Sequence, residues 1–171
     1  MIRIVIAEDQ EMLLGAIGSL LNLEEDMEVV GQASNGEEAL ALVHRLQPDV
    51  CIMDIEMPEM SGLEAAESLK AFGCKVIILT TFARSGYYRR ALQADVSGYL
   101  LKDSPSEELA GSIRSIIIGQ RIYCPELIDE DSYQNEQNIK EFQPLAERKT
   151  KISSVRNYLT TILDRIKLPT G

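Results

Sequence analysis

The first 120 residues alternate apolar runs of strand length with amphipathic segments of helix length, and this alternation limits the possible folds. The strand-like runs, several of them rich in β-branched residues, occupy residues 2–7, 28–33, 49–54, 75–81 and 97–102. The helical patterns occupy residues 11–23, 35–46, 61–73, 87–94 and 104–120. Five strand-then-helix units predict an α/β fold in which helices cover both faces of a parallel five-stranded sheet.

The last helical pattern has a predicted start and an unusual apolar row. Ser104 or Ser106 is expected to cap it, with acidic residues in the first turn that complement the helix dipole. Its aliphatic row offers more surface than a single contact with the sheet requires, and it consists of Ile113, Ile116, Ile117 and Ile118. The row either only seals the sheet or, with the first helix, forms a homodimer contact.

Composition places the chain among ordinary globular proteins, with 45% apolar and 26% charged residues in 171. No apolar stretch approaches the roughly 20 residues that span a bilayer, and the start becomes acidic before a signal-peptide core could form. We therefore expect a cytoplasmic protein without membrane insertion. Cys51, Cys74 and Cys124 are too far apart to suggest a disulfide framework or a zinc site, and His44 is interpreted as a surface residue.

The C-terminal part differs in character and in charge. Residues 1–135 contain 10 Lys/Arg against 23 Asp/Glu, whereas residues 136–171 contain 7 against 4 and are therefore net basic. Residues 129–141 are polar and acidic, which is typical of a linker. From residue 153 an amphipathic pattern predicts one helix, whose apolar stripe consists of Val155, Leu159, Ile162 and Ile166.

Polar residues stand at the ends of four predicted strands. Glu8 and Asp9 follow the first strand, and Asp54 ends the third. Thr80 ends the fourth strand and Lys102 the fifth. In an open parallel sheet, ligands bind beyond the carboxyl ends of the strands, where the strand order reverses. We therefore expect these residues to gather around one site.

The chemistry of this site can be predicted from its charges. Carboxylates held close together repel one another, so either one is protonated or a cation joins them. Oxygen ligands favour a hard cation such as Mg²⁺, while Lys102 and the Thr80 hydroxyl suit phosphoryl oxygens. Asp54 could then be a nucleophile that forms an acyl phosphate. Taken singly, an acidic pair after a strand is also typical of a solvated loop, and a lysine there of a surface charge.

Four motifs carry a resemblance to a known family: "AEDQ", "MDIEMPEMSG", "ILTTF" and "GYLLKD". With them, residues 1–122 resemble the receiver domain of bacterial two-component response regulators, specifically the NarL/LuxR group. The resemblance implies a flavodoxin-like (βα)5 fold. It also implies that the protein is not an enzyme, apart from slow self-catalysed phosphotransfer and dephosphorylation. It implies that a sensor histidine kinase phosphorylates Asp54, and that Thr80 and Lys102 contact the phosphoryl group. The implied Mg²⁺ ligands are Asp9, Asp54 and the backbone carbonyl of Glu56, with Glu8 in support.

The resemblance also implies an output. Tyr99 would be the aromatic switch residue that turns inward with Thr80; the alternative is an ordinary strand aromatic that packs on the sheet. Regulators of this group bind promoter DNA as dimers through a C-terminal helix-turn-helix, and transcription control in a membrane-lipid desaturation response is expected here. After a linker at 123–143, residues 144–171 resemble only a truncated part of that domain, a short helical remnant. Its candidate DNA contacts are Arg156, Asn157 and Tyr158.

Two alternatives remain open from the residues alone. A stand-alone receiver would act by binding another protein instead of DNA. A phosphatase of the aspartate-nucleophile type would share the sheet and the strand-end aspartate. Such enzymes usually need a second aspartate two residues later as general acid, and Glu56 occupies that place here.

Overall fold

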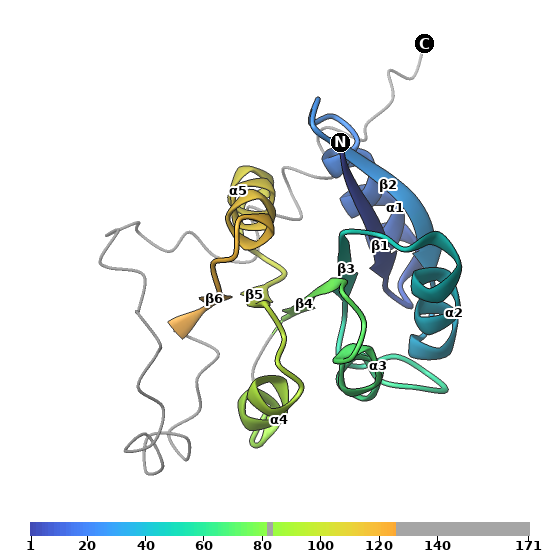
Figure 1. Ribbon diagram of the computed structural model, residues 1–171, viewed down its shortest axis with the longest axis vertical. Helices are drawn as coiled ribbons and strands as arrows, with labels where there is room; N and C mark the ends of the chain where they lie inside the picture. Colours follow the sequence, from blue (N-terminus) through green and yellow to red (C-terminus); the bar gives the residue numbers. More distant parts are fainter. Residues whose placement is uncertain (82–83, 126–171) are drawn as a thin grey trace.

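The computed structural model describes residues 1–81 and 84–125, which form a parallel sheet between two layers of helices (Figure 1). The strands are β1 (Ile2–Ala7), β2 (Met27–Ala33), β3 (Val50–Met53), β4 (Lys75–Thr80), β5 (Gly98–Leu101) and β6 (Ile122–Tyr123). Their order in the sheet is β2-β1-β3-β4-β5-β6. The helices are α1 (Glu11–Leu21), α2 (Gly36–Leu46), α3 (Gly62–Leu69), α4 (Tyr87–Gln93) and α5 (Ser106–Ile117). The predicted flavodoxin-like fold is confirmed.

The central strands are apolar throughout because both faces of the sheet are covered. All four residues of β3 are buried. Cys51 and Met53 point into the core layer beneath α2, α3 and α4, whereas Val50 and Ile52 point into the layer beneath α1 and α5. A strand between two helical layers buries every side chain, so its sequence shows a continuous apolar run.

The helices begin with different chemistry. Asn35 caps α2 by accepting a hydrogen bond from the Glu38 amide, and Ser61 forms a capping box with Glu64 at the start of α3. The predicted serine cap of α5 is wrong, because Pro105 occupies the cap position and makes no side-chain cap bond. Ser106 is instead the first residue of that helix.

The aliphatic row of α5 serves mainly the core. Ile113 and Ile116 are fully buried against the sheet, and Ile117 is partly buried. Of the two alternatives for this row, Ile113 and Ile116 follow the first and seal the sheet. Ile118, which follows the helix, is 77% exposed.

The sheet contains a sixth strand that the sequence analysis did not predict. β6 runs parallel to β5, with Ile122 paired to Gly98 and Tyr123 paired to Tyr99. Two residues are too few to produce a recognisable periodic pattern. Tyr123 thus pairs within the sheet, one residue past the predicted end of the receiver at residue 122.

Three predictions concern residues outside the described part of the chain: the linker beyond residue 125, the helical remnant at 144–171, and the candidate DNA contacts Arg156, Asn157 and Tyr158. Within the described part of the chain, none of the helices is both long enough and apolar enough to cross a membrane.

Candidate functional site

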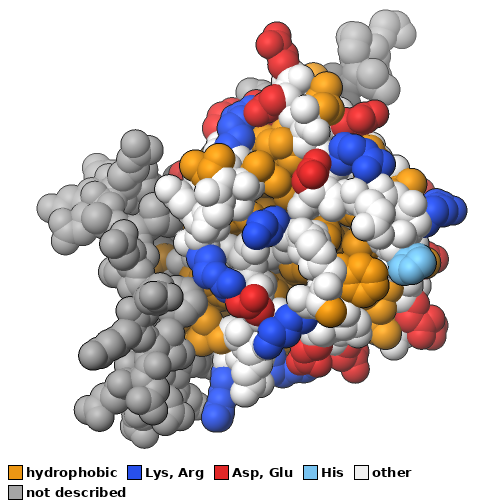
Figure 2. All heavy atoms as spheres, viewed as in Figure 1, with side chains coloured by type: hydrophobic (Ala, Val, Ile, Leu, Met, Phe, Trp, Pro, Cys, Tyr) orange, Lys and Arg blue, Asp and Glu red, His pale blue; other side chains and the backbone are white. Residues whose placement is uncertain are grey.

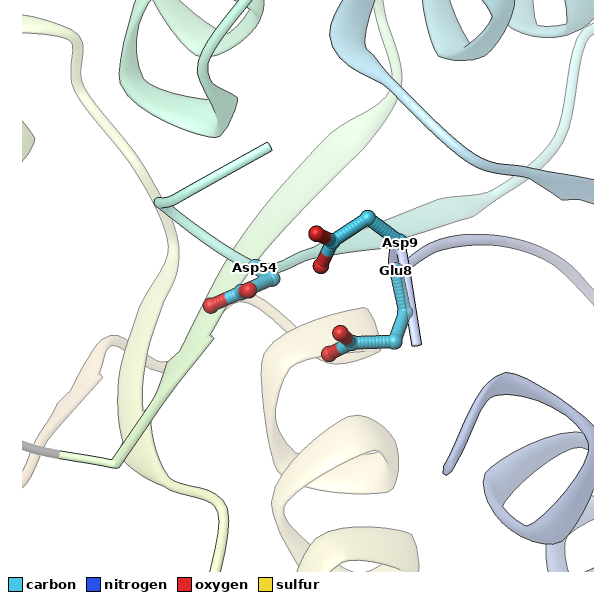
Figure 3. A group of neighbouring side chains, drawn as sticks. All are labelled: Glu8, Asp9 and Asp54. Atoms are coloured by element: carbon cyan, nitrogen blue, oxygen red, sulfur yellow. The ribbon is translucent and has the colours of Figure 1, made fainter. Parts of the chain in front are cut away.

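Three carboxylates meet at the edge of the sheet where β1 and β3 lie side by side (Figure 3). Glu8 and Asp9 directly follow β1, and Asp54 directly follows β3. Each of the three side chains has a carboxylate oxygen within 4.8 Å of those of the other two. The strand order reverses at β1 and β3, since β2 continues on one side and β4 on the other, which is where open sheets bind ligands.

A buried lysine joins this cluster from β5. The Lys102 Nζ atom lies 2.5 Å from Glu8 Oε2 and 3.1 Å from Asp54 Oδ2. Its side chain is 8% exposed, so the ammonium is held between the two carboxylates instead of extending into solvent. The Lys102 backbone amide also donates to the Thr80 carbonyl at 2.8 Å, which fixes the end of β5 against the end of β4.

The cluster is short of positive charge. Burial raises the pKa of Glu8, and the nearby Asp54 charge raises it further, while Lys102 lowers it only in part. Burial likewise raises the pKa of Asp54 despite its contact with Lys102. Three carboxylates and one ammonium carry an excess of negative charge, so this environment disfavours its own ionised carboxylates and would favour a bound cation.

The backbone around Asp54 holds its carboxylate in a defined direction. The Asp54 amide donates to the Ala7 carbonyl at 3.0 Å, and Oδ1 accepts the Ile55 amide at 2.8 Å. The start of α3 comes so close that a Cβ atom on Gly62 would lie 1.9 Å from the Asp54 carbonyl oxygen. Sequence reasoning did not identify this packing role of Gly62.

The two remaining predicted residues of the site lie on the neighbouring strands. Thr80 is buried at the end of β4, between the strands that carry Asp54 and Lys102. Tyr99 is fully buried in β5 and pairs with Ile78 of β4. In this structure the Tyr99 side chain therefore points inward, which is one of the two positions of an aromatic switch residue.

Glu56 is outside the carboxylate cluster. Its Oε1 atom accepts a hydrogen bond from the Tyr87 hydroxyl at 3.1 Å and lies 2.9 Å from Arg84 Nε. These contacts connect the segment after β3 to α4, and sequence reasoning did not predict them. The side chain is thus engaged elsewhere, which leaves the backbone carbonyl as the part of Glu56 that was predicted to bind a metal.

The other reactive side chains of the described residues do not form a second site. His44 is exposed and packs edge-on against Phe72, with ring centroids 6.1 Å apart, so its prediction as a surface residue is confirmed. This only histidine of the chain is visible on the face in Figure 2, where basic and acidic side chains are interspersed. Cys51 is fully buried, and burial raises the pKa of its thiol.

Comparisons with known proteins agree with this geometry. The family model described as "Response regulator receiver domain" matches residues 4–114. The transcriptional regulatory protein DesR of Bacillus subtilis is 56% identical over 189 residues, covering 98% of this chain and 92% of that protein. The uncharacterized transcriptional regulatory protein YvfU of the same organism is 52% identical over 182 residues, covering 97% and 91%.

Solved structures give the same result for the fold. A DNA-binding response regulator of the LuxR family from Staphylococcus aureus is 41% identical, with a TM-score of 0.66, covering 68% of this chain and 99% of that one. A two-component response regulator of the LuxR family from Aurantimonas is 27% identical, with a TM-score of 0.70, covering 77% and 96%.

Proposed function

The chain belongs to the response regulator receiver family, and from this premise we propose that Asp54 is the residue through which phosphorylation controls transcription. The single observation that carries the proposal is the convergence of Glu8, Asp9, Asp54 and Lys102 at the carboxyl edge of the sheet. A histidine kinase is the expected donor of the phosphoryl group. A cytoplasmic location, where such a donor has access to ATP, is part of the proposal.

In the proposed transfer, an Asp54 carboxylate oxygen attacks the phosphorus of a phosphohistidine. A P–O bond forms, the P–N bond breaks, and the imidazole leaves with the bonding electron pair and takes up a proton. The product is an acyl phosphate on Asp54. Because Oδ1 accepts the Ile55 amide and Oδ2 contacts Lys102, the carboxylate is oriented before the donor arrives.

The other residues neutralise and position charge. Lys102 Nζ is 3.1 Å from the attacking Asp54 carboxylate and can move onto a phosphoryl oxygen as negative charge develops there. The Thr80 hydroxyl, buried at the end of β4, would donate to another phosphoryl oxygen.

The donor set also fits a divalent metal ion. Three carboxylate oxygens within 4.8 Å of one another, with one lysine beside them, suit a hard cation. We assign Asp9, Asp54 and the Glu56 carbonyl as Mg²⁺ ligands, with Glu8 in support. When bound, Mg²⁺ would neutralise phosphoryl oxygens during transfer.

The position of the Glu56 carboxylate argues against phosphatase chemistry. A general acid two residues after the nucleophile would need to reach the leaving group, but this carboxylate is bonded to Tyr87 and Arg84. We therefore propose at most slow self-catalysed phosphotransfer and dephosphorylation.

For the output, we propose a phosphorylation-dependent homodimer through α1 and α5 that binds promoter DNA. Large apolar side chains are exposed on or beside these helices, with Met12 at 76%, Leu23 at 70% and Ile118 at 77%. Arg156, Asn157 and Tyr158 stay the candidate DNA contacts.

The test is incubation of the full chain with a small phosphodonor and Mg²⁺, followed by intact mass spectrometry. The proposal predicts one added phosphate that is absent without Mg²⁺ and absent in Asp54→Ala. Phosphate incorporation that survives Asp54→Ala would overturn it. A gel shift with promoter DNA, at low salt, then separates DNA binding from a receiver that acts only by binding another protein.

A further inference from the structure

Three tyrosine rings from three different elements pack against one another next to the switch position. Tyr88 comes from α4, Tyr99 from β5 and Tyr123 from β6. The ring centroids of Tyr99 lie 6.2 Å from those of both Tyr88 and Tyr123, and Tyr88 and Tyr123 are 5.9 Å apart. Aromatic pairs at such distances contribute attraction beyond the area they bury, so the three rings form one packed unit.

Tyr123 fastens this unit to the edge of the sheet. Its hydroxyl donates to the Val96 carbonyl at 2.6 Å, and burial raises its pKa, so the phenol keeps its proton at neutral pH. Two backbone bonds hold the strand itself, from the Ile122 amide to Ser97 and from the Cys124 amide to Tyr99, at 3.0 and 2.8 Å. A two-residue edge strand with few ladder bonds is easily displaced, so the ring packing contributes much of what keeps β6 in place.

The same strand, β5, carries both this aromatic unit and the phosphorylation site. Tyr99 is three residues before Lys102, whose ammonium contacts Glu8 and Asp54. On the other side of β5, the Cys124 amide donates to the Tyr99 carbonyl. A change in the position of the Tyr99 ring therefore alters the surface against which Tyr123 packs. The backbone of Tyr99 is also hydrogen-bonded to Cys124, the residue after Tyr123.

We propose that Tyr123 is a positioning residue of the phosphorylation switch, which holds Tyr99 in its buried position and thereby couples the state of Asp54 to the docking of β6. The inference rests on the proposed phosphorylation of Asp54. Because the Tyr99 ring packs against Tyr88 and Tyr123, an outward turn of Tyr99 removes a contact that holds β6. If the phosphorylated site favours the buried ring, it also favours docked β6.

The coupling must act in both directions. A ligand at Asp54 that stabilises docked β6 is itself bound more tightly when β6 is docked, by the same factor. The chain continues from β6 at residue 125 into its C-terminal part, so docking of β6 sets where that part begins.

The experiment uses the full chain with Mg²⁺ and beryllofluoride, whose occupancy at the site is followed by the ¹⁹F signal of the bound form. Hydrogen exchange is measured at the Ile122 and Cys124 amides, which donate the two ladder bonds of β6. The expected result is slower exchange at both amides on binding. Full occupancy with unchanged exchange at both would overturn the inference and leave the proposed function standing, whereas absent binding would overturn both.

Variants test the reciprocal effect. Tyr123→Ala should weaken beryllofluoride binding by about tenfold, whereas Tyr123→Phe, which keeps the ring, should stay within about threefold of the wild type. Gln120→Ala is the matched control, because the Gln120 side chain is exposed just before β6 and takes no part in the three ring contacts. It should bind as the wild type does. Wild-type affinity in Tyr123→Ala would contradict the inference, and the exchange experiment still decides if that variant fails to fold.

Discussion

Replacing Asp54 with asparagine should make the protein more stable at neutral pH in the absence of Mg²⁺. Asp54 is 9% exposed and shares its pocket with two other carboxylates. Its pKa is raised, chiefly by burial, which means that the folded state disfavours the charged form. Asparagine has nearly the same shape but no charge, so the folded state should gain from the exchange.

The size of the gain follows from the separations of the charges. The carboxylate oxygens of Asp54, Glu8 and Asp9 lie within 4.8 Å of one another, and at that upper limit, with an effective dielectric constant of about 20, each pair of unit charges repels by about 3.5 kcal/mol. The attraction of Lys102 at 3.1 Å, about 5 kcal/mol on the same scale, opposes this repulsion. The difference predicts that Asp54→Asn raises the free energy of unfolding by about 1 to 2 kcal/mol, or Tm by about 3 to 6 °C.

The assay is urea unfolding of both proteins across a range of pH, with and without Mg²⁺. A raised pKa means that folding takes up a proton at Asp54, so the wild type gains stability as the pH falls through this pKa. The advantage of Asp54→Asn should therefore be largest at neutral pH and shrink on acidification toward the ordinary aspartate value of 3.8. The Asp54 charge also raises the pKa of Glu8 in the wild type and not in the variant, which changes the stability difference with pH in the same direction. Mg²⁺ should stabilise the wild type more than the variant.

Two results would refute this reasoning. An Asp54→Asn protein that is less stable than the wild type at pH 7 without Mg²⁺ would mean that the pocket favours the ionised carboxylate. A stability difference that does not change with pH would mean that the effect of the substitution is not electrostatic.

Three further substitutions test other parts of the site. Lys102→Met should lower the free energy of unfolding at pH 7 by about 3 kcal/mol, because Glu8 and Asp54 lose their counter-ion. Mg²⁺ should restore part of the lost stability. An unchanged urea midpoint would contradict the buried pairing. Gly62→Ala should destabilise the protein by about 3 kcal/mol, because the added Cβ would collide with the Asp54 carbonyl. As its control, Gly15→Ala in α1, where the space is open, should stabilise the protein by about 0.5 to 1 kcal/mol. Similar thermal midpoints for the two variants would argue against the close approach of Gly62 to Asp54. Glu56→Ala should weaken Mg²⁺ binding by less than the roughly tenfold expected when a group that supports a metal ligand is removed, because the Glu56 carboxylate is bonded to Tyr87 and Arg84. Calorimetric titration measures this affinity, and a larger loss would place the carboxylate at the metal.

Much of the fold was predictable because its signals are local and repeated. β1 has the predicted bounds, and the five strands and five helices predicted within the first 120 residues all exist, with ends that differ by a few residues. β6 escaped prediction because two residues carry no period, and its existence depends on the free edge of β5. The cap of α5 was mispredicted because serine is a common cap, whereas Pro105 begins this helix through its fixed backbone angle alone.

The convergence of the site was predictable for a topological reason. Parallel strands end at one edge of a sheet, so Glu8, Asp9, Asp54 and Lys102 had to approach one another once the strands were assigned. Which group pairs with which was not predictable, because the contact of Lys102 with Glu8 depends on side-chain length and direction.

Other contacts had no signal in the sequence at all. The bonds of Glu56 with Arg84 and Tyr87 connect segments about 30 residues apart, and no spacing rule relates them. Likewise, the sequence shows that Ile113 and Ile116 are apolar but not which side of α5 faces the sheet over β5 and β6.

The most direct test of the account is to locate the phosphate by chemical trapping. After phosphorylation of the full chain in the presence of Mg²⁺, borohydride reduces an aspartyl phosphate to homoserine, and peptide mass spectrometry identifies the converted position. The account predicts homoserine at position 54 alone, in amounts that depend on Mg²⁺. Homoserine at another aspartate, or a phosphate on a histidine, serine or threonine with position 54 unchanged, would contradict it.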